Sequence, residues 1–381
     1  MDNSLPEILD GKNINFLIGS GTGVPLFPTL SLGEKLPSFE EIVSSKKLSM
    51  KNNMILYCYY YAKWISPMQL HKMGSSGMNY ISVSKQYRIF ISTLLEILTR
   101  GSNEKPKRAN IFTTNYDLLF ENTFDYISQH NPLCYFNDGS RGFIARTLDT
   151  DNFYLNVSHS GNYDNYNREV PTINLFKMHG SISWEKLDNK IIISYKNSVL
   201  SKADKCLLEI ENFDLTKIDK IFSMMEPNIE LNASISDLDK QLDEIDLDVA
   251  QVKKFFKVYE NLPIINPNKW KFHDTVFDQH YYQLIRAFSY EMEKRDVVLV
   301  IFGFSFADEH LLDIFKRSML NPSLQVIIIC YNNKQKKDMR HIFEGYNNIT
   351  YLPSSFRNDQ GNPIHGDFRF LNNLLRGEKD D

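Results

Sequence analysis

Five short apolar runs, each followed at once by small or polar residues, constrain the fold of this chain more than any other feature of its sequence. They span residues 14–18, 109–112, 173–178, 297–302 and 324–330. Runs of this length that are rich in Ile, Val and Phe are typical of strands buried on both faces, as in a parallel sheet. We therefore expect each run to form a buried strand.

Helical patterns lie between these runs. They cover residues 87–98, 118–127, 280–293 and 310–320. In the first of them, Ile91, Leu95 and Leu98 recur on one helical face. Strands that alternate with helices predict a doubly wound, mainly parallel α/β sheet of the Rossmann type. Ligands of such sheets bind beyond the carboxyl ends of the strands, where the polar residues of this sequence stand.

The region 185–262 interrupts the alternation. Residues 201–260 carry 14 acidic and 8 basic side chains, and Ile235, Leu238 and Leu242 follow a helical spacing. We expect an acidic, largely helical insertion that serves as a cap over the site or as an assembly surface. A solvated helical insertion is the alternative interpretation of its charges. The α/β domain would then consist of residues 1–184 and 263–381.

The composition limits the class of protein. With 42% hydrophobic and 24% charged residues, the chain is expected to fold around a core. No apolar window is long enough to span a membrane, and the N-terminus lacks the features of a secretory signal. A net charge of −4 does not provide the positive electrostatic field that attracts nucleic acid. The cysteines are far apart in sequence, at Cys58, Cys134, Cys206 and Cys330. We expect a cytoplasmic protein without zinc and without a membrane or nucleic-acid partner.

The first apolar run leads into a glycine-rich segment, Gly19-Ser20-Gly21-Thr22-Gly23. Glycines after a strand let the backbone approach a pyrophosphate, and a helix start offers unpaired N–H groups. The segment matches neither the GxGxxG fingerprint nor a P-loop, which requires a following Lys-Ser/Thr. Taken alone, it is better interpreted as a tight turn.

The second run leads into Thr113-Thr114-Asn115-Tyr116-Asp117. An asparagine here can orient a water molecule or hold a ribose hydroxyl, and an aspartate can hold hydroxyls or oppose a developing cation. Both side chains could instead cap the helix that is expected to begin near residue 118. The two interpretations are balanced for Asp117, whereas Asn115 favours a functional role.

The third and fourth motifs follow two later runs. His179, next to a glycine, can act as a general base near neutral pH, although alone it is better interpreted as a structural histidine. Gly303 and Ser305 stand where a strand end meets a phosphate or a ribose. Asp308 and His310 in the same motif are interpreted as caps of the following helix.

Together, in this order and spacing, the four motifs resemble the sirtuin family of NAD-consuming enzymes. The segments TNYDLLFE, MHGSISW and GFSFADEHLLDIF are more similar to the bacterial sirtuin-like branch found in antiphage defence proteins. The resemblance covers about residues 12–180 and 260–335.

The resemblance implies an NAD+ pocket and a set of catalytic residues. The residues that it places in the pocket are Gly19, Ser20, Gly21, Thr22, Gly23, Thr114, Gly303, Ser305 and Asn332. It implies that Asn115 positions a water molecule and that Asp117 holds a hydroxyl or stabilises positive charge. His179 would deprotonate the water or the ribose hydroxyl.

Two departures from the sirtuin pattern bear on the activity. The four-cysteine zinc module is absent, and Thr114 stands where deacetylating sirtuins carry Gln. The resemblance then implies an NAD+ glycohydrolase that depletes NAD+ in antiviral, abortive-infection defence. The alternatives are a non-catalytic sensor of NAD+ or ADP-ribose, a protein deacylase, and a structural subunit.

The resemblance also implies partners. Sirtuin-like defence chains of this size resemble those that form homo-oligomers and pair with a HerA-type hexameric ATPase. The candidate interfaces are the acidic insertion and the aromatic segment 57–64, for which a core helix is an equal or better interpretation. Tyrosine and tryptophan are enriched in interfaces because they combine a large contact area with a polar end.

Overall fold

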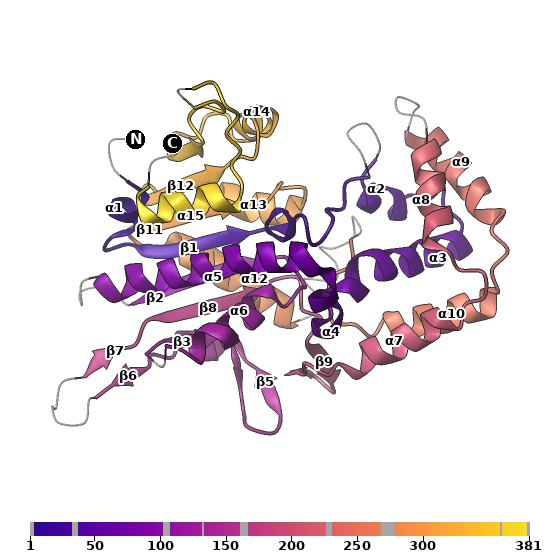
Figure 1. Ribbon diagram of the computed structural model, residues 1–381, viewed down its shortest axis with the longest axis horizontal. Helices are drawn as coiled ribbons and strands as arrows, with labels where there is room; N and C mark the ends of the chain where they lie inside the picture. The colour runs from indigo at the N-terminus through magenta and orange to yellow at the C-terminus, as the bar shows by residue number, and fades with distance from the viewer. Residues whose placement is uncertain are drawn as a thin grey trace.

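The computed structural model has a central sheet of seven strands, all parallel, in the order β13-β12-β11-β1-β2-β8-β3 (Figure 1). The strands are β1 (Asn13–Ile18), β2 (Arg108–Thr113), β3 (Tyr135–Asn137), β8 (Thr172–Lys177), β11 (Val297–Phe302), β12 (Leu324–Ile329) and β13 (Ile349–Leu352). The structure describes residues 4–32, 37–101, 107–131, 133–160, 167–225, 231–267, 279–358 and 360–378. The expected doubly wound, mainly parallel α/β fold is confirmed.

Helices cover both faces of this sheet. One face carries α1 (Leu5–Leu9), α5 (Gly77–Arg100), α6 (Leu119–Ser128) and α15 (Phe368–Arg376); the other carries α12 (Gln279–Glu293), α13 (Glu309–Ser318) and α14 (Asn333–Ile342). Each face of the sheet packs against its helices in a separate hydrophobic core, and alternate residues of each strand point into one core or the other. Phe16, for example, packs on the first face and Leu17 on the second. All four predicted helices are present, although α5 begins ten residues before the expected start.

The chain adds strands first on one side of β1 and then on the other side. From β1 it builds outward through β2 to β8 and β3, and it then returns to the opposite side of β1 to form β11, β12 and β13. After β1 the chain continues toward β2, whereas after β11 it continues toward β12 on the opposite side. A crevice at such a switch point is the usual ligand site of this fold.

A group of helices beside the sheet combines two distant parts of the sequence (Figure 1). The first part, between β1 and α5, supplies α2 (Phe39–Val43), α3 (Met50–Tyr60), the π-helical turn Tyr61–Ile65 and α4 (Leu70–Met73). The second, within the predicted insertion, supplies α7 (Ser198–Leu208), α8 (Leu215–Met224), α9 (Leu231–Asp243) and α10 (Val249–Tyr259). Helix α3 packs against α9 and α10, so the apolar face of the insertion is covered by the same chain.

The aromatic segment 57–64 lies in the middle of this helical group. The rings of Tyr57 and Tyr61 contact aromatic rings of α10, and the Tyr59 ring contacts Phe222 of α8. Trp64 is only 3% exposed. The interpretation of this segment as an intermolecular interface is therefore wrong, and the alternative of a core helix is correct.

The first residues of the predicted insertion are not helical. They form β9 (Trp184–Leu187) and β10 (Lys190–Ile193), which join β4 (Ser140–Arg141) and β5 (Arg146–Leu148) in a small antiparallel sheet. A two-stranded sheet of β6 (Ser158–His159) and β7 (Arg168–Glu169) lies elsewhere in the chain. No helix in the described part of the chain is both long and apolar enough to cross a membrane.

Three buried asparagines form a ladder across the centre of the sheet. Asn15, Asn110 and Asn174 occupy paired positions on β1, β2 and β8. The Asn110 amide donates to Asn15 Oδ1 at 2.9 Å, and the Asn174 amide donates to Asn110 Oδ1 at 2.8 Å. Because a shift of one residue would break both bonds, the ladder specifies the register of the three strands.

Replacing Asn110 with alanine should therefore destabilise the fold. The substitution leaves an acceptor on Asn15 and a donor on Asn174 without their ladder partners, and each buried unpaired group costs about 1–3 kcal/mol. We expect the free energy of unfolding, measured in urea, to fall by ~2–4 kcal/mol. The exposed control Asn347→Ala should stay within ~0.5 kcal/mol of the wild type, and equal values for the two variants would contradict the role of the ladder.

Candidate active site

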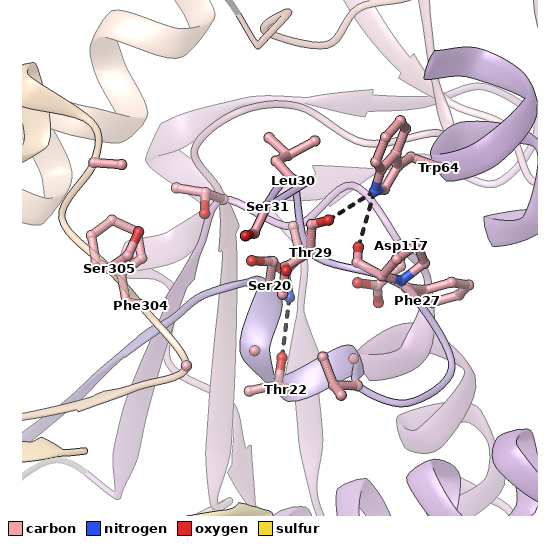
Figure 2. A pocket seen from close by; sticks show the side chains of 18 of the residues that line it. Ser20, Thr22, Phe27, Thr29, Leu30, Ser31, Trp64, Asp117, Phe304 and Ser305 are labelled. Carbon is pink, nitrogen blue, oxygen red and sulfur yellow. Dashed lines mark hydrogen bonds between the residues drawn. The ribbon is translucent and has the colours of Figure 1, made fainter. Parts of the chain in front are cut away.

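A cavity of about 880 Å³ opens at the carboxyl ends of five strands of the main sheet. Ser20 follows β1, Thr114 follows β2, His179 follows β8, Ser305 follows β11 and Tyr331 follows β12, and all five line the cavity. The size is in the usual range of small-molecule and cofactor sites. Figure 2 shows Ser305 and Phe304 across the cavity from Ser20.

The structure brings most of the sequence-predicted site residues to this one cavity. Those that line it are Ser20, Gly21, Thr22, Gly23, Thr114, Asn115, Asp117, His179, Gly303 and Ser305. Two others are not lining residues. Gly19 lies directly beneath the turn, and Asn332 caps α14, where its Oδ1 accepts from the Gln335 amide at 2.9 Å.

The turn after β1 (Ser20–Gly23) packs backbone to backbone against the turn after β11. The Gly19 amide donates to the Phe302 carbonyl at 3.0 Å, and the Gly21 amide donates to the Gly303 carbonyl at 3.0 Å. A Cβ on Gly19 would stand 2.4 Å from the Gly303 carbonyl oxygen, and one on Gly21 would stand 2.8 Å from Gly303 Cα. These glycines are required because the two turns touch.

Thr22 is the hub of the hydrogen bonds behind the turn. Its hydroxyl donates to the Gly19 carbonyl at 2.8 Å and accepts from the Tyr87 hydroxyl at 2.9 Å and from Asn115 Nδ2 at 3.2 Å. Burial raises the pKa of Tyr87, so its hydroxyl stays protonated and donates. With the Thr22 hydroxyl engaged by three protein groups, Ser20 supplies the hydroxyl of the turn that is available to a ligand.

Asn115 and Asp117 have different tasks after β2. Asn115 Nδ2 donates to the Gly19 carbonyl at 3.1 Å as well as to Thr22, so this side chain binds the turn rather than capping a helix. Asp117 Oδ1 accepts from the Leu119 amide at 2.9 Å at the start of α6, as the capping interpretation predicts. Asp117 also lines the cavity, so the two interpretations of this residue are compatible.

His179 is held from both sides. Its carbonyl accepts from the Ile265 amide at 2.9 Å, and its Nε2 lies 3.1 Å from Asp308 Oδ2, within ion-pair distance but not aligned for a hydrogen bond. Gly180 has a φ of +86°, and a Cβ there would stand 2.1 Å from the Pro263 carbonyl oxygen. The His-Gly pair therefore allows residues 263–265 to pack directly against the loop.

Asp308 is a site residue that sequence reasoning assigned only to capping. One carboxylate oxygen does cap α13, accepting from the Leu311 amide at 3.1 Å, while the other faces His179. His310, also interpreted as a cap, is half-buried near both groups, and burial lowers its pKa. Asp308 stands within a motif that the sequence singled out, but nothing in that motif indicates proximity to His179.

The segment after the turn lies over the cavity and is tied to the helical group. Trp64 Nε1 donates to the carbonyls of Pro28 and Thr29 at 3.1 and 3.3 Å (Figure 2). Thr29, Leu30 and Ser31 line the cavity next to Trp64. The contribution of Trp64 to the site was missed because its sequence context indicates only an apolar helix.

The opposite end of the cavity is formed by the C-terminal part of the chain. Gly366 donates to the Tyr331 carbonyl at 3.2 Å, and the Tyr331 ring stacks on His365 with centroids 4.9 Å apart. Asp367, which caps α15, and Gln335 also line this end. Asn332, the residue predicted from the sequence after β12, does not line the cavity, whereas Tyr331 and Gln335 do.

The charged side chains that line the cavity are predominantly acidic. Among the described lining residues there are four carboxylates and a single histidine, but no lysine or arginine. The carboxylates belong to Glu40, Asp117, Asp308 and Asp367. Such a lining favours a ligand that carries, or develops, positive charge.

Part of the chain matches a known protein family. Residues 109–223 fit the family model of the SIR2-like domain. The matched stretch includes Asn115, Asp117 and His179, whereas the glycine turn after β1 and the loop after β11 lie outside it. No curated protein matches the chain.

SIR2-like domains bind NAD+ and typically belong to NAD-utilising enzymes, which agrees with the sirtuin resemblance of the motifs. Within the described ranges, no three His, Cys, Asp or Glu side chains are grouped so that they could hold a metal ion. Cys58, Cys206 and Cys330 are buried, and burial raises the pKa of the Cys58 and Cys330 thiols.

The close approach of the two turns predicts a graded response to alanine. Gly19→Ala forces a methyl group against the Gly303 backbone, and overpacking of this kind costs about 1–3 kcal/mol. Gly23→Ala is the matched control, because its Cβ would meet only the Phe27 side chain at 3.2 Å, which can move. The midpoint temperature of thermal unfolding should be much lower for Gly19→Ala than for Gly23→Ala. The reverse order of the two midpoints would show that the turns are not in contact.

A buried acid behind the site predicts a pH dependence of stability. Burial raises the pKa of Glu121 to about 7, an effect only partly offset by Lys177. The folded chain then holds this proton up to about pH 7, whereas the unfolded chain releases it near pH 4.5. The stabilising contribution of the protonated carboxyl is therefore present at low pH and is lost as the pH rises through this window.

We expect the free energy of unfolding of the wild type, minus that of Glu121→Gln, to decrease between about pH 4.5 and pH 7 and then to level off. Urea titrations of both proteins at several pH values measure this difference. A difference that rises with pH, as for a carboxyl with a lowered pKa, would contradict the assignment.

Proposed function

We propose that the chain is an NAD+ hydrolase that cleaves the bond between nicotinamide and its ribose, releasing nicotinamide and ADP-ribose. The observation that carries the proposal is the convergence of Asn115, Asp117 and His179 in one cavity beside the glycine turn. These three side chains come from the loops after two neighbouring strands, β2 and β8, within the stretch that matches the SIR2-like domain.

The order of the strands supports one orientation of the dinucleotide. If the pyrophosphate lies at the turn after β1, the two halves of the molecule extend toward opposite edges of the sheet. Asn115, Asp117 and His179, called the polar trio from here on, stand on the β2 and β8 side. Ser305 and Tyr331 stand on the β11 and β12 side. We assign the nicotinamide riboside to the first side and the adenosine to the second.

The charges of the cavity support the bond cleavage. When the C1′–N bond breaks, its electron pair leaves with neutral nicotinamide and the ribose carbon becomes cationic. Asp117 is 2% exposed and lies beside the assigned ribose position, and a buried carboxylate stabilises a nearby cation more strongly than one in water.

The remaining groups support attack by water on that cation. The Asn115 amide nitrogen is engaged by the turn, so its Oδ1 is the group that can accept a hydrogen bond from the attacking water. His179 takes the proton that the water loses, and the carboxylate of Asp308, 3.1 Å from Nε2, stabilises the resulting imidazolium. A protein that only senses NAD+ would need the turn but not this His–Asp pair.

The biological role is proposed from the sequence resemblance. Similarity to the sirtuin-like branch of antiphage proteins supports NAD+ depletion in abortive infection. A hydrolase of this kind must be restrained until infection, and we propose that a homo-oligomer, paired with a HerA-type hexameric ATPase, provides that restraint. With segment 57–64 buried inside the chain, the acidic insertion of residues 185–262 remains the proposed contact surface.

Substitutions of the polar trio test the proposal. Asn115→Ala and His179→Ala should each lower the rate of nicotinamide release by ~10²- to 10⁴-fold, the usual effect of losing one acid–base or positioning group. His71→Ala, at an exposed position outside the cavity, is the control and should retain the wild-type rate. Circular dichroism must show that all three variants are folded; a wild-type rate for His179→Ala would refute the mechanism.

A further inference from the structure

A buried lysine lies directly behind the polar trio and is not used in the mechanism above. Lys177 is the last residue of β8, and its side chain is 4% exposed. Its ammonium donates to the backbone carbonyl of Asp117 and, at 3.4 Å, to that of Asn115. Lys177 is not among the residues that line the cavity, so it does not reach a ligand there.

This one side chain connects the two loops that carry the trio. The carbonyls that it binds belong to Asn115 and Asp117, whose side chains line the cavity. Lys177 itself stands two residues before His179 on the neighbouring strand. Its ammonium therefore spans the gap between the β2 loop and the β8 loop at the point where they face the cavity.

The energetics argue against a role in stability alone. The carboxyl of Glu121 lies beside the ammonium of Lys177, with Nζ and Oε1 3.4 Å apart, and it is also buried. Its Oε2 has no hydrogen-bond partner among the described residues. Burying an ammonium beside an incompletely satisfied carboxyl typically stabilises a fold no better than apolar packing does. What the ammonium provides is a fixed distance between two loops.

We propose that Lys177 is a positioning residue for the hydrolysis, holding the backbone of Asn115 and Asp117 in place relative to His179. The inference rests on the proposed function, since it concerns the rate of that reaction. Misplacement of catalytic groups by about 1 Å can cost ~10²-fold in rate, and loss of the ammonium frees both carbonyls to move.

The chain contains a matched control. Lys336 on α14 is 7% exposed, and its ammonium donates to the carbonyls of Pro353 and Ser354 at 2.6 and 3.0 Å. It does not line the cavity. Lys177→Met and Lys336→Met therefore remove the same ammonium from buried positions where it binds two backbone carbonyls, and only the first touches the loops of the site.

The first measurement is steady-state nicotinamide release, together with calorimetric binding of ADP-ribose. We expect Lys177→Met to lower kcat by ~10²-fold while the KM and the ADP-ribose Kd stay within ~3-fold, because the turn and the adenosine side are untouched. Lys336→Met should keep kcat within ~3-fold of the wild type. A wild-type kcat for Lys177→Met, or an equal loss in both variants, would overturn the proposal.

The second measurement, hydrogen exchange, does not depend on activity. Amides of residues 114–118 should exchange faster in Lys177→Met, and those of Ser354 and Ser355 should exchange faster in Lys336→Met. Unchanged exchange at 114–118 would overturn the positioning role, whereas a wild type that releases no nicotinamide would refute only the hydrolase. Lys177→Gln, which is neutral and one atom shorter, replaces the methionine variant if that variant does not fold, with the same expectations.

Discussion

The contact between two glycine-containing turns at the centre of the sheet is the constraint on which the site depends. Gly19 and Gly21 touch Gly303 with no room for a side chain between them, and two backbone hydrogen bonds join the turns. The contact lies at the switch point of the sheet, where β1 separates β2 from β11. It closes the floor of the cavity and brings the loop after β11 beside the loop after β1.

Polar side chains then connect the loops that carry Asn115, Asp117 and His179 to this floor. Asn115 binds the Gly19 carbonyl and Thr22, so the loop after β2 is positioned by the turn itself. Lys177 extends the same connection to β8, and the Ile265 amide secures His179 from the far side. Each connection uses a buried polar group whose loss would be costly, so the site and the core are stabilised by the same bonds.

Much of this architecture could be predicted from the sequence because buried parallel strands have a strong apolar signal. All five apolar runs are strands, and the polar residues that follow four of them line one cavity. Strands β3 and β13 were missed because they have only three and four residues, several of them partly exposed, so neither forms a continuous apolar run.

Other features depend on contacts between segments that are far apart in sequence, which local patterns do not encode. The aromatic residues 57–64 are consistent with an interface or a core until α8 and α10 are seen to cover them. The pairing of Asp308 with His179 joins loops more than a hundred residues apart in sequence. The sequence indicated only that Asp308 caps a helix, and it gave no sign that the same side chain also faces His179. The expectation for Asn332 was wrong in the opposite way. Its place after a strand indicated contact with a ligand, but its side chain caps a helix.

In the proposed binding mode, the glycine turn separates the side of the cavity that binds the nicotinamide riboside from the side that binds the adenosine. The most direct test is a crystal structure of the chain with a non-hydrolysable NAD+ analogue in which the ribose ring oxygen is replaced by carbon. We predict that the pyrophosphate lies at Ser20, the nicotinamide beside Asn115 and His179, and the adenosine beside Ser305 and Tyr331. An analogue bound in the reverse orientation, or outside this cavity, would contradict the account.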